Sequence, residues 1–165
     1  MAPMGTTPPT RTSITVSVDA MGGDRGPEAV VGGLALSARR NPDIRFILHG
    51  DAARLTPLVA RAGEALKDRC EVRHADRTIT MDEKPSQVVR NGQDSSMWSA
   101  VEAVRAGDAA VAVSCGNTGA LMALSMLRLR RLPGVNRPAI ACLWPSRNPA
   151  GFNVMLDVGA DVRAD

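Results

Sequence analysis

The stretch Ile14–Glu28, ITVSVDAMGGDRGPE, decides how this chain is expected to fold. Its first five residues are typical of a buried β-strand, and the turn Asp19–Pro27 follows them. Pro27 suits the first position of a helix, and Glu28 suits the positive end of a helix dipole. A strand that runs through a glycine-rich turn into a helix is the repeating unit of an α/β fold.

The same alternation continues along the chain. The pattern predicts further strands at Ile44–Leu48, 70–74, Ala109–Val113, Ala139–Leu143 and Asn153–Leu156. The strand at 70–74 alternates with charged residues, which favours a sheet edge. Ala109–Val113 is apolar on both faces, which favours the centre of a parallel sheet. We therefore predict an α/β fold, with an open, mostly parallel sheet and helices on both faces.

Helix ends are indicated by capping residues. Asp51 is expected to cap the helix after the second strand, and Ser86 a short helix that contains Val88 and Val89. Asp94 or Ser95 is expected to cap a longer helix that Gly107 ends. The helix after Ala109–Val113 is apolar nearly all round, so we expect it to be deeply buried.

Composition sets broad limits on function. The chain has 165 residues, 44% of them hydrophobic, which suits one domain with a real core after a flexible tail at residues 1–13. Aromatic residues make up only 2%, which disfavours nucleic-acid binding by base stacking. The three cysteines show no disulfide spacing, and no apolar run is long enough to cross a membrane. We expect a cytoplasmic protein.

Two glycine-rich turns are the first candidates for chemistry. In parallel sheets, loops at strand carboxyl ends converge, and helix N-termini there present free N–H groups to anions. The first turn holds Gly22 and Gly23 between Asp19 and Asp24. These carboxylates would repel a phosphate that lies directly on them. They either tie down the loop backbone or handle a proton or a cationic group, so the turn is either a ligand contact or a local scaffold. Asp157 and Gly159 follow the last predicted strand and belong to a third loop of this kind.

The second turn, Ser114–Gly119, is the more informative one. It offers donors without a charge at the mouth of a buried strand, from Ser114, Asn117 and Thr118 around Gly116 and Gly119. Alternatively, Ser114–Gly119 is only a tight turn, in which Asn117 or Thr118 caps the next helix.

The polar middle of the chain holds further candidates. Lys84 and Arg90 could offset the charge of a phosphate, and Ser95 and Ser96 either contact it or cap a helix. Cys115 is interpreted as a packing residue, because a catalytic thiolate needs a partner that lowers its pKa. No His, Cys or carboxylate cluster has the spacing of metal ligands, and no cofactor motif is present.

Five motifs in register carry a resemblance to a known family. They are VDAMGGDRGPEAVV (18–31), KPSQVVRNGQDSSMWSAVEAV (84–104), VSCGNTGALMA (113–123), RPA (137–139) and LDVGAD (156–161). Together they resemble the bacterial acyl-ACP:phosphate acyltransferases, the PlsX family of fatty acid and phospholipid synthesis proteins. Two positions depart from the family pattern, Cys115 in place of alanine and Asp161 in place of asparagine.

The resemblance implies a fold like that of phosphotransacetylases and isopropylmalate dehydrogenases. It implies an enzyme that makes acyl phosphate from inorganic phosphate and an acyl group on acyl carrier protein. A homodimer and peripheral association with the inner face of the membrane are also implied. Family members are longer, so residues 14–165 are expected to be the N-terminal part of a truncated domain.

Phosphate itself is the nucleophile in this reaction, so no Ser–His or Cys–His pair is needed. The amides around Gly116–Gly119, with Asn117 and Thr118, suit the stabilisation of an oxyanion or a phosphate. Lys84 and Asn117 are the candidate catalytic residues. A phosphotransacetylase-type enzyme that uses acyl-CoA and a catalytically silent binding or assembly module remain the alternatives.

Overall fold

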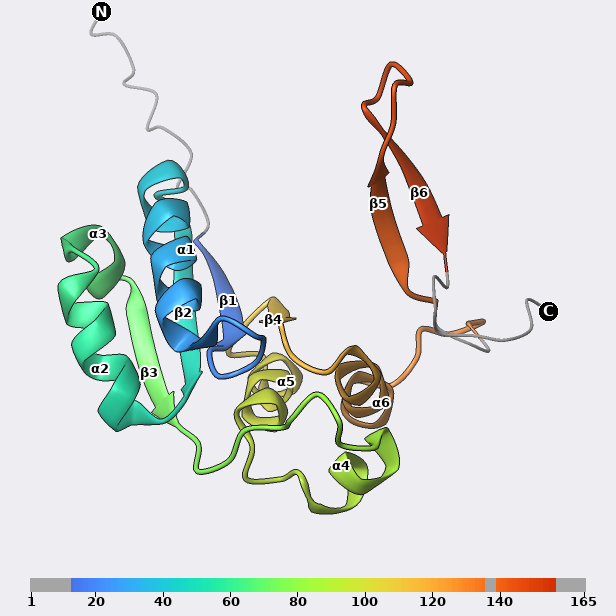
Figure 1. Cartoon of the computed structure of the whole chain (residues 1–165), viewed down its shortest axis with the longest axis horizontal. Helices are drawn as coiled ribbons and strands as arrows, with labels where there is room; N and C mark the ends of the chain where they lie inside the picture. Colours follow the sequence, from blue (N-terminus) through green and yellow to red (C-terminus); the bar gives the residue numbers. More distant parts are fainter. Residues whose placement is uncertain (1–12, 136–138, 157–165) are drawn as a thin grey trace, which may run out of the picture.

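The computed structural model describes residues 13–135 and 139–156. Its centre is a parallel four-stranded sheet with the strand order β3-β2-β1-β4 (Figure 1). The strands of this sheet are β1 (Ile14–Asp19), β2 (Ile44–Gly50), β3 (Cys70–His74) and β4 (Val111–Ser114).

Helices cover both faces of the sheet, as the sequence predicted (Figure 1). One face carries α1 (Gly26–Arg40), α2 (Ala52–Arg61) and α3 (Glu64–Lys67). The opposite face carries α5 (Ser96–Ala106), with α4 (Pro85–Asn91) and α6 (Thr118–Arg128) beside it. The predicted α/β class is confirmed.

Each helical layer has its own apolar core. On the α1 side, Val18 and Leu48 of the sheet are buried against Val31 of α1 and Leu55 of α2. On the other side, Met97 and Trp98 of α5 pack with Leu124 of α6. The second core holds α4, α5 and α6 together, and it therefore fixes the loops that join them to the sheet.

Most predicted helix ends are confirmed. The Asp51 carboxylate accepts a hydrogen bond from the Ala53 amide at 2.9 Å, and the Ser95 hydroxyl accepts one from the Trp98 amide at 3.3 Å. Gly107 ends α5 with a φ of 85°, in the left-handed region that favours glycine. The predicted cap at Ser86 is wrong, because Pro85 already begins the helix and Ser86 lies inside it.

The predicted central position of the Ala109–Val113 strand is wrong for the described residues. There β4 pairs only with β1 and forms one end of the sheet. Val111 and Val113 are 45% and 44% exposed, on the face that α1 covers over β1 and β2. Apolar residues on both faces of a strand indicate a buried position, but they do not say which segment covers it.

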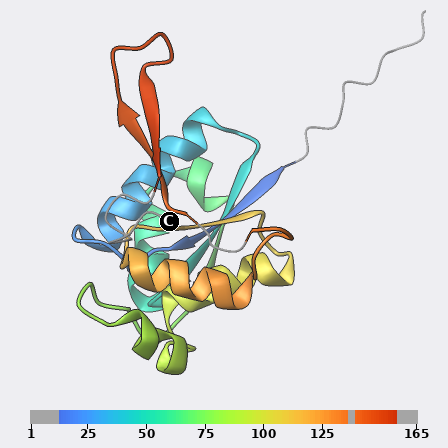
Figure 2. The same ribbon diagram turned by 90° about the vertical axis from the view of Figure 1, so that its right-hand side faces the viewer.

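The helix predicted to be deeply buried is buried along one side only. In α6, Ala120 and Leu124 are buried, whereas Met126 and Leu127 are 41% and 49% exposed. After it, β5 (Ala141–Pro145) and β6 (Phe152–Leu156) form an antiparallel hairpin that stands apart from the parallel sheet in Figure 1 and rises above the helices in Figure 2. The two predicted strands are present, but they pair with each other.

Candidate functional site

The two glycine-rich turns lie side by side at one end of the sheet. The strand order turns back between β1 and β4, because β2 and β3 lie on one side of β1 and β4 on the other. Asp19 ends β1 and is in register with Ser114, which ends β4. In open α/β sheets, ligands bind in the crevice at this switch point, beyond the carboxyl ends of the strands.

The carboxylate of Asp19 joins the two turns. Its Oδ1 accepts hydrogen bonds from the hydroxyl of Ser96 at 2.7 Å and from the amides of Met21 and Gly22 at 3.2 Å. Its Oδ2 accepts one from the Ser114 hydroxyl at 2.7 Å. Asp19 is only 2% exposed, so it ties β1, β4 and α5 together. The structure therefore gives Asp19 the loop-holding role that the sequence left open.

Glycine is required where the turns touch. A Cβ on Gly22 would lie 2.8 Å from the amide nitrogen of Gly116. Gly23 has a φ of 96°, and a Cβ there would lie 2.9 Å from the Cβ of Cys115. Any side chain at either position would force the two turns apart. A hollow of about 370 Å³ opens beside this contact, lined by residues 22–26, Ala29, Val30 and Cys115.

The side chain of Asn117 is committed to the fold. Its Oδ1 accepts a hydrogen bond from the Ala120 amide at 3.0 Å and caps α6. Its Nδ2 lies 2.9–3.2 Å from the carbonyl oxygens of Thr80, Met81 and Glu83. The expectation that this side-chain amide faces an oxyanion is therefore not met in the structure.

The backbone at the start of α6 is available instead. Amides in the first turn of a helix have no intrahelical acceptor, and those of Thr118 and Gly119 belong to this turn. They lie at the positive end of the helix dipole, which favours an anion.

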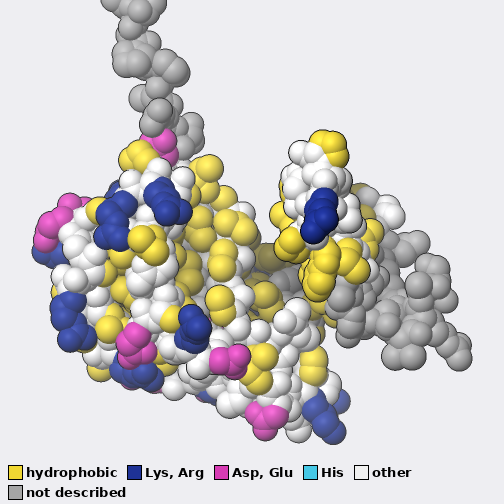
Figure 3. Space-filling view, turned by 45° about the horizontal axis from the view of Figure 1, so that its top comes forward, with side chains coloured by type: hydrophobic (Ala, Val, Ile, Leu, Met, Phe, Trp, Pro, Cys, Tyr) yellow, Lys and Arg dark blue, Asp and Glu magenta, His cyan; other side chains and the backbone are white. Residues whose placement is uncertain are grey.

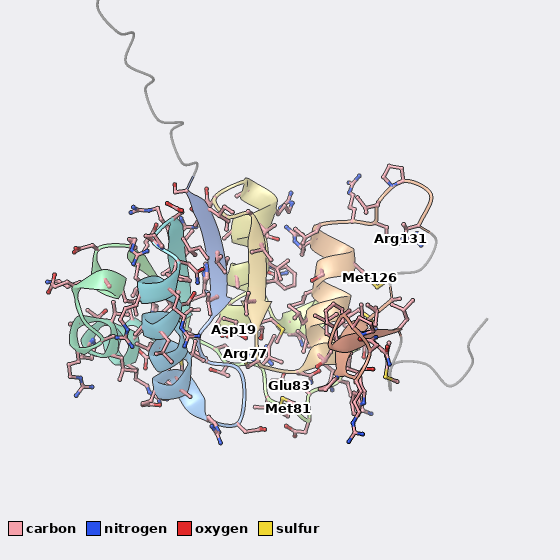
Figure 4. All side chains as sticks on the ribbon, turned by 90° about the horizontal axis from the view of Figure 1, so that it is seen from above. Asp19, Arg77, Met81, Glu83, Met126 and Arg131 are labelled. Atoms are coloured by element: carbon pink, nitrogen blue, oxygen red, sulfur yellow. The ribbon has the colours of Figure 1, made fainter. Side chains whose placement is uncertain are left out.

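Sequence reasoning did not find the loop that Asn117 holds. In it, Glu83 forms an ion pair with Arg77 and accepts a hydrogen bond from the Thr80 amide at 2.9 Å. Figure 4 labels Asp19, Arg77, Met81 and Glu83, which lie at the same end of the molecule. The spacing Thr80-x-x-Glu83 is that of a capping box, and this signal could have predicted an ordered loop.

The remaining residues that the sequence predicted for the site fall into two groups, exposed ones on α4 and buried ones at the start of α5. Lys84 and Arg90 are exposed at the two ends of α4, and Pro85 lies next to Gly119 of α6. The hydroxyls of Ser95 and Ser96 are fully buried and donate to the Gly92 carbonyl and to Asp19. These two serines hold the site from behind and do not face its surface. Asp157 and Gly159 lie outside the described residues.

His49 lies one residue beyond the predicted strand Ile44–Leu48 but belongs to β2, where it is fully buried. The Ser17 hydroxyl donates to the Ala100 carbonyl, so the Nε2–H of His49 donates to Ser17 Oγ at 2.9 Å. Its Nδ1 then accepts a hydrogen bond from the Ser99 hydroxyl at 2.7 Å. Burial, with a smaller contribution from the charge of Arg73, lowers the pKa of His49 to about 4. This histidine is neutral and structural at physiological pH.

Two kinds of feature are absent from the part of the chain that the structure describes. Between residues 13 and 156, leaving out 136–138, no group of His, Cys, Asp and Glu side chains could hold a metal ion. No helix in these same ranges is long and apolar enough to cross a membrane.

The fold defines an α/β protein whose two glycine-rich turns meet at the switch point of a parallel sheet, where ligands bind in open α/β folds. The chain belongs to the family described as fatty acid synthesis protein, whose family model matches residues 14–165.

Its curated relatives bear the name phosphate acyltransferase. The chain is 70% identical to the one from Paracoccus denitrificans and 69% identical to one from Cereibacter sphaeroides, over 152 residues in each case. It is 66% identical over 161 residues to the one from Dinoroseobacter shibae. These matches cover 92%, 92% and 96% of this chain, but only 41–42% of each relative. The chain thus spans about two-fifths of the length of the relatives.

Proposed function

We propose that this chain forms the phosphate-binding wall of an acyltransferase that makes acyl phosphate from acyl-ACP and inorganic phosphate, for phospholipid synthesis. One observation carries the proposal. Asp19 and two glycine contacts bring both turns to the switch point of the sheet, beside the N-terminus of α6. The names of the relatives supply the reaction class.

The chemistry asks little of the side chains. A phosphate oxygen attacks the carbonyl carbon of the thioester, and a tetrahedral oxyanion forms. The C–S bond then breaks, and the proton of the attacking hydrogen phosphate passes to the leaving sulfur. The carrier therefore leaves as the thiol, and the acyl phosphate remains. The chain has to place the two reactants and stabilise the negative charge that develops. The amides of Thr118 and Gly119 suit this task because they lie at the positive end of a rigid helix.

The roles of the other residues follow from their positions. Asp19 and Asn117 are positioning residues, because their polar atoms bind the protein itself. Lys84, exposed at the start of α4, and Arg90 supply positive charge to phosphate or to an acidic carrier. The remaining features of the proposed enzyme are a homodimer in the cytoplasm and contact with the inner membrane surface through the part of the relatives outside the match.

A matched pair of variants tests the backbone amides. Thr118→Pro removes the Thr118 N–H at the first position of α6, where proline is tolerated. Asn117 has a φ of −58° and a ψ of 108°, which lies outside the α region that a following proline disfavours. Thr118→Val keeps the N–H and removes only the hydroxyl.

We expect Thr118→Pro to weaken binding of inorganic phosphate by about tenfold, the loss of one charge-assisted hydrogen bond, and Thr118→Val to change it by less than threefold. The measurement is calorimetric titration of the 165-residue chain with phosphate. If both variants bound phosphate with the same affinity, the proposed role of the Thr118 amide in phosphate binding would be wrong.

Turnover is measured in a full-length chimera in which this chain replaces the 152 matched residues of the Paracoccus relative. Acyl-ACP and acyl-CoA are supplied in parallel, and acyl phosphate is detected. Product from acyl-ACP supports the proposal, and product from acyl-CoA alone points to a phosphotransacetylase-type enzyme. If the 165-residue chain binds no phosphate and the chimera shows no turnover, the chain is a binding or assembly module.

A further inference from the structure

A long apolar groove lies along the side of α6 that the core leaves open. Ala120 and Leu124 of α6 are buried in the core, yet the helix is apolar nearly all round. The groove has a volume of about 1150 Å³. The α6 residues that line it are Thr118, Gly119, Met122, Ala123, Met126 and Leu127. The second apolar side of α6 therefore faces a groove and not the core.

The spacing of these residues places them in one stripe. Pairs recur every four residues, at 118–119, 122–123 and 126–127, and residues four apart lie one above the other on a helix. The stripe begins at the amides of Thr118 and Gly119 and follows α6 to its last turn. At about 1.5 Å per residue, it extends roughly 12 Å from Gly119 to Leu127.

Other elements complete the groove with apolar side chains. Pro85 and Val89 of α4 line it, as do Ile140 and Cys142 at β5. Figure 3 shows the molecule hollowed between its main body and the hairpin, with hydrophobic side chains on both sides. A groove of this shape and lining suits an elongated apolar ligand.

The two ends of the groove differ in chemistry. Thr118 and Gly119 form one end, at the positive end of the α6 dipole. Arg131 lines the other end, and Figure 4 shows it with Met126 at the end of α6 away from Asp19. An apolar group gains little by covering a guanidinium, because the charge has to leave water. The apolar part of a ligand is therefore expected to end before Arg131.

We propose that the groove along α6 binds the acyl chain of the substrate, which begins at the Thr118 and Gly119 amides and ends at Met126 and Leu127. The inference rests on the proposed function, which places the reacting carbonyl at those amides. Met126 and Leu127 are 41% and 49% exposed, so an acyl chain that covers them removes apolar surface from water. The flexible thioethers of Met122 and Met126 adapt their shape to the chain.

The length of the stripe sets the length of chain that the groove favours. An extended chain advances roughly 1.2 Å per bond, so a saturated chain that starts at the amides reaches Leu127 after about ten carbons. Carbons beyond this point meet Arg131 or solvent. Met126 and Leu127 are therefore specificity-determining residues for chain length.

Alkyl phosphates of six to fourteen carbons measure the groove in the 165-residue chain, by calorimetric titration below the concentrations at which they form micelles. Full burial of a methylene raises affinity about fourfold, and an open groove covers only part of each methylene. Affinity should therefore rise about twofold per carbon up to about ten carbons and then become constant. An affinity that does not depend on chain length would overturn the proposal.

Leu127→Trp shortens the groove, with Leu36→Trp as the matched control. Leu36 of α1 is 50% exposed, as Leu127 is, but does not line the groove. Leu127→Trp should weaken binding of dodecyl phosphate about tenfold and that of hexyl phosphate by less than twofold, because six carbons end before Leu127. Leu36→Trp should change either affinity by less than twofold. An equal loss with both variants would contradict the proposal, and an equal loss of both probes with Leu127→Trp would place the phosphate at Arg131 and overturn it.

The same titrations in the full-length chimera test other occupants of the groove. The ratio of dodecyl to hexyl phosphate affinity should again fall about tenfold with Leu127→Trp. A ratio that this variant leaves unchanged would show that the longer chain or a second copy covers α6, and the proposal would be wrong.

The proposal and the proposed function can fail separately. Decanol and hexanol carry the chain without the phosphate. If decanol binds more tightly than hexanol in a way that Leu127→Trp removes, while inorganic phosphate does not bind, the groove holds apolar chains and the proposed reaction is wrong. If inorganic phosphate binds and chain length has no effect, the groove proposal is wrong and the proposed function stands.

Discussion

The two edges of the sheet, β3 and β4, are built in opposite ways. In β3, Glu71 and Arg73 stand among the apolar residues, and Arg73 forms ion pairs with Glu71 at 2.7 Å and with Asp108 at 2.6 Å. In β4 every residue before Ser114 is apolar, and Val111 and Val113 are 45% and 44% exposed. Charged residues protect an edge from further pairing. Among the described residues β3 is therefore a protected edge of the sheet, whereas β4 is an unprotected one.

Removal of the Asp19 carboxylate should have the largest effect and should act on the β4 edge. Asp19→Ala leaves the hydroxyls of Ser96 and Ser114 and two backbone amides without their acceptor. We expect a loss of about 3–4 kcal/mol in the free energy of unfolding, measured with urea. Hydrogen exchange should accelerate more in β4 than in β3, because Asp19 holds the end of β4 to β1.

Asp24→Asn is the control for this prediction, since Asp24 lies in the same turn but is exposed. It should change the free energy of unfolding by less than about 0.5 kcal/mol. If Asp19→Ala accelerated exchange equally in β3 and β4, Asp19 would stabilise the whole sheet and would not tie down β4 in particular.

His49 of β2 and His74 of β3 should contribute differently to the pH dependence of the free energy of unfolding. The pKa of His49 is lowered from 6.5 to about 4, so the unfolded chain takes up the proton before the folded chain does. Stability from this group is therefore complete above pH 6.5 and is lost as the pH falls from 6.5 to 4. The loss is on the order of 3 kcal/mol.

The measurement is urea unfolding between pH 7 and pH 4, in which carboxylates also titrate. The contribution of His49 is therefore the difference between the parent chain and His49→Gln, which lacks it. His74→Gln is the control, because His74 is exposed on the edge strand. A pH dependence that His74→Gln reduces as much as His49→Gln does would contradict the assignment to the buried histidine.

The fold was largely predictable because its signals are local. The strand at Ile14, Pro27 at the start of α1 and the Asp51 cap each follow from a few neighbouring residues. The contact between the two turns was also predictable, since carboxyl ends of neighbouring parallel strands meet. The position of β4 was not, because an apolar strand is compatible with any buried place in a sheet.

The roles of individual side chains were harder to predict. Asn117 had two possible partners in the sequence, a ligand or the backbone, and the decision came from a loop at Thr80–Glu83 that is distant in sequence. Ser95 and Ser96 are hydroxyl residues of the same type, yet one caps its own helix and the other binds Asp19. Only the packing of α5 against the sheet separates these roles.

The smallest effect is expected from Arg73→Ala, which tests the protected edge. The ion pairs of Arg73 are partly exposed, so the free energy of unfolding should fall by less than about 1 kcal/mol.

The charge of Arg73 also contributes to the low pKa of His49, although burial contributes more. Loss of that positive charge favours the protonated imidazole, so the pKa of His49 should rise from about 4. NMR titration of the imidazole measures this rise, with Arg105→Ala as a control whose ion pair with Glu102 lies on α5. An unchanged pKa with Arg73→Ala would show that burial alone holds His49 neutral, and that the charges of β3 protect the edge without reaching the buried histidine beside it.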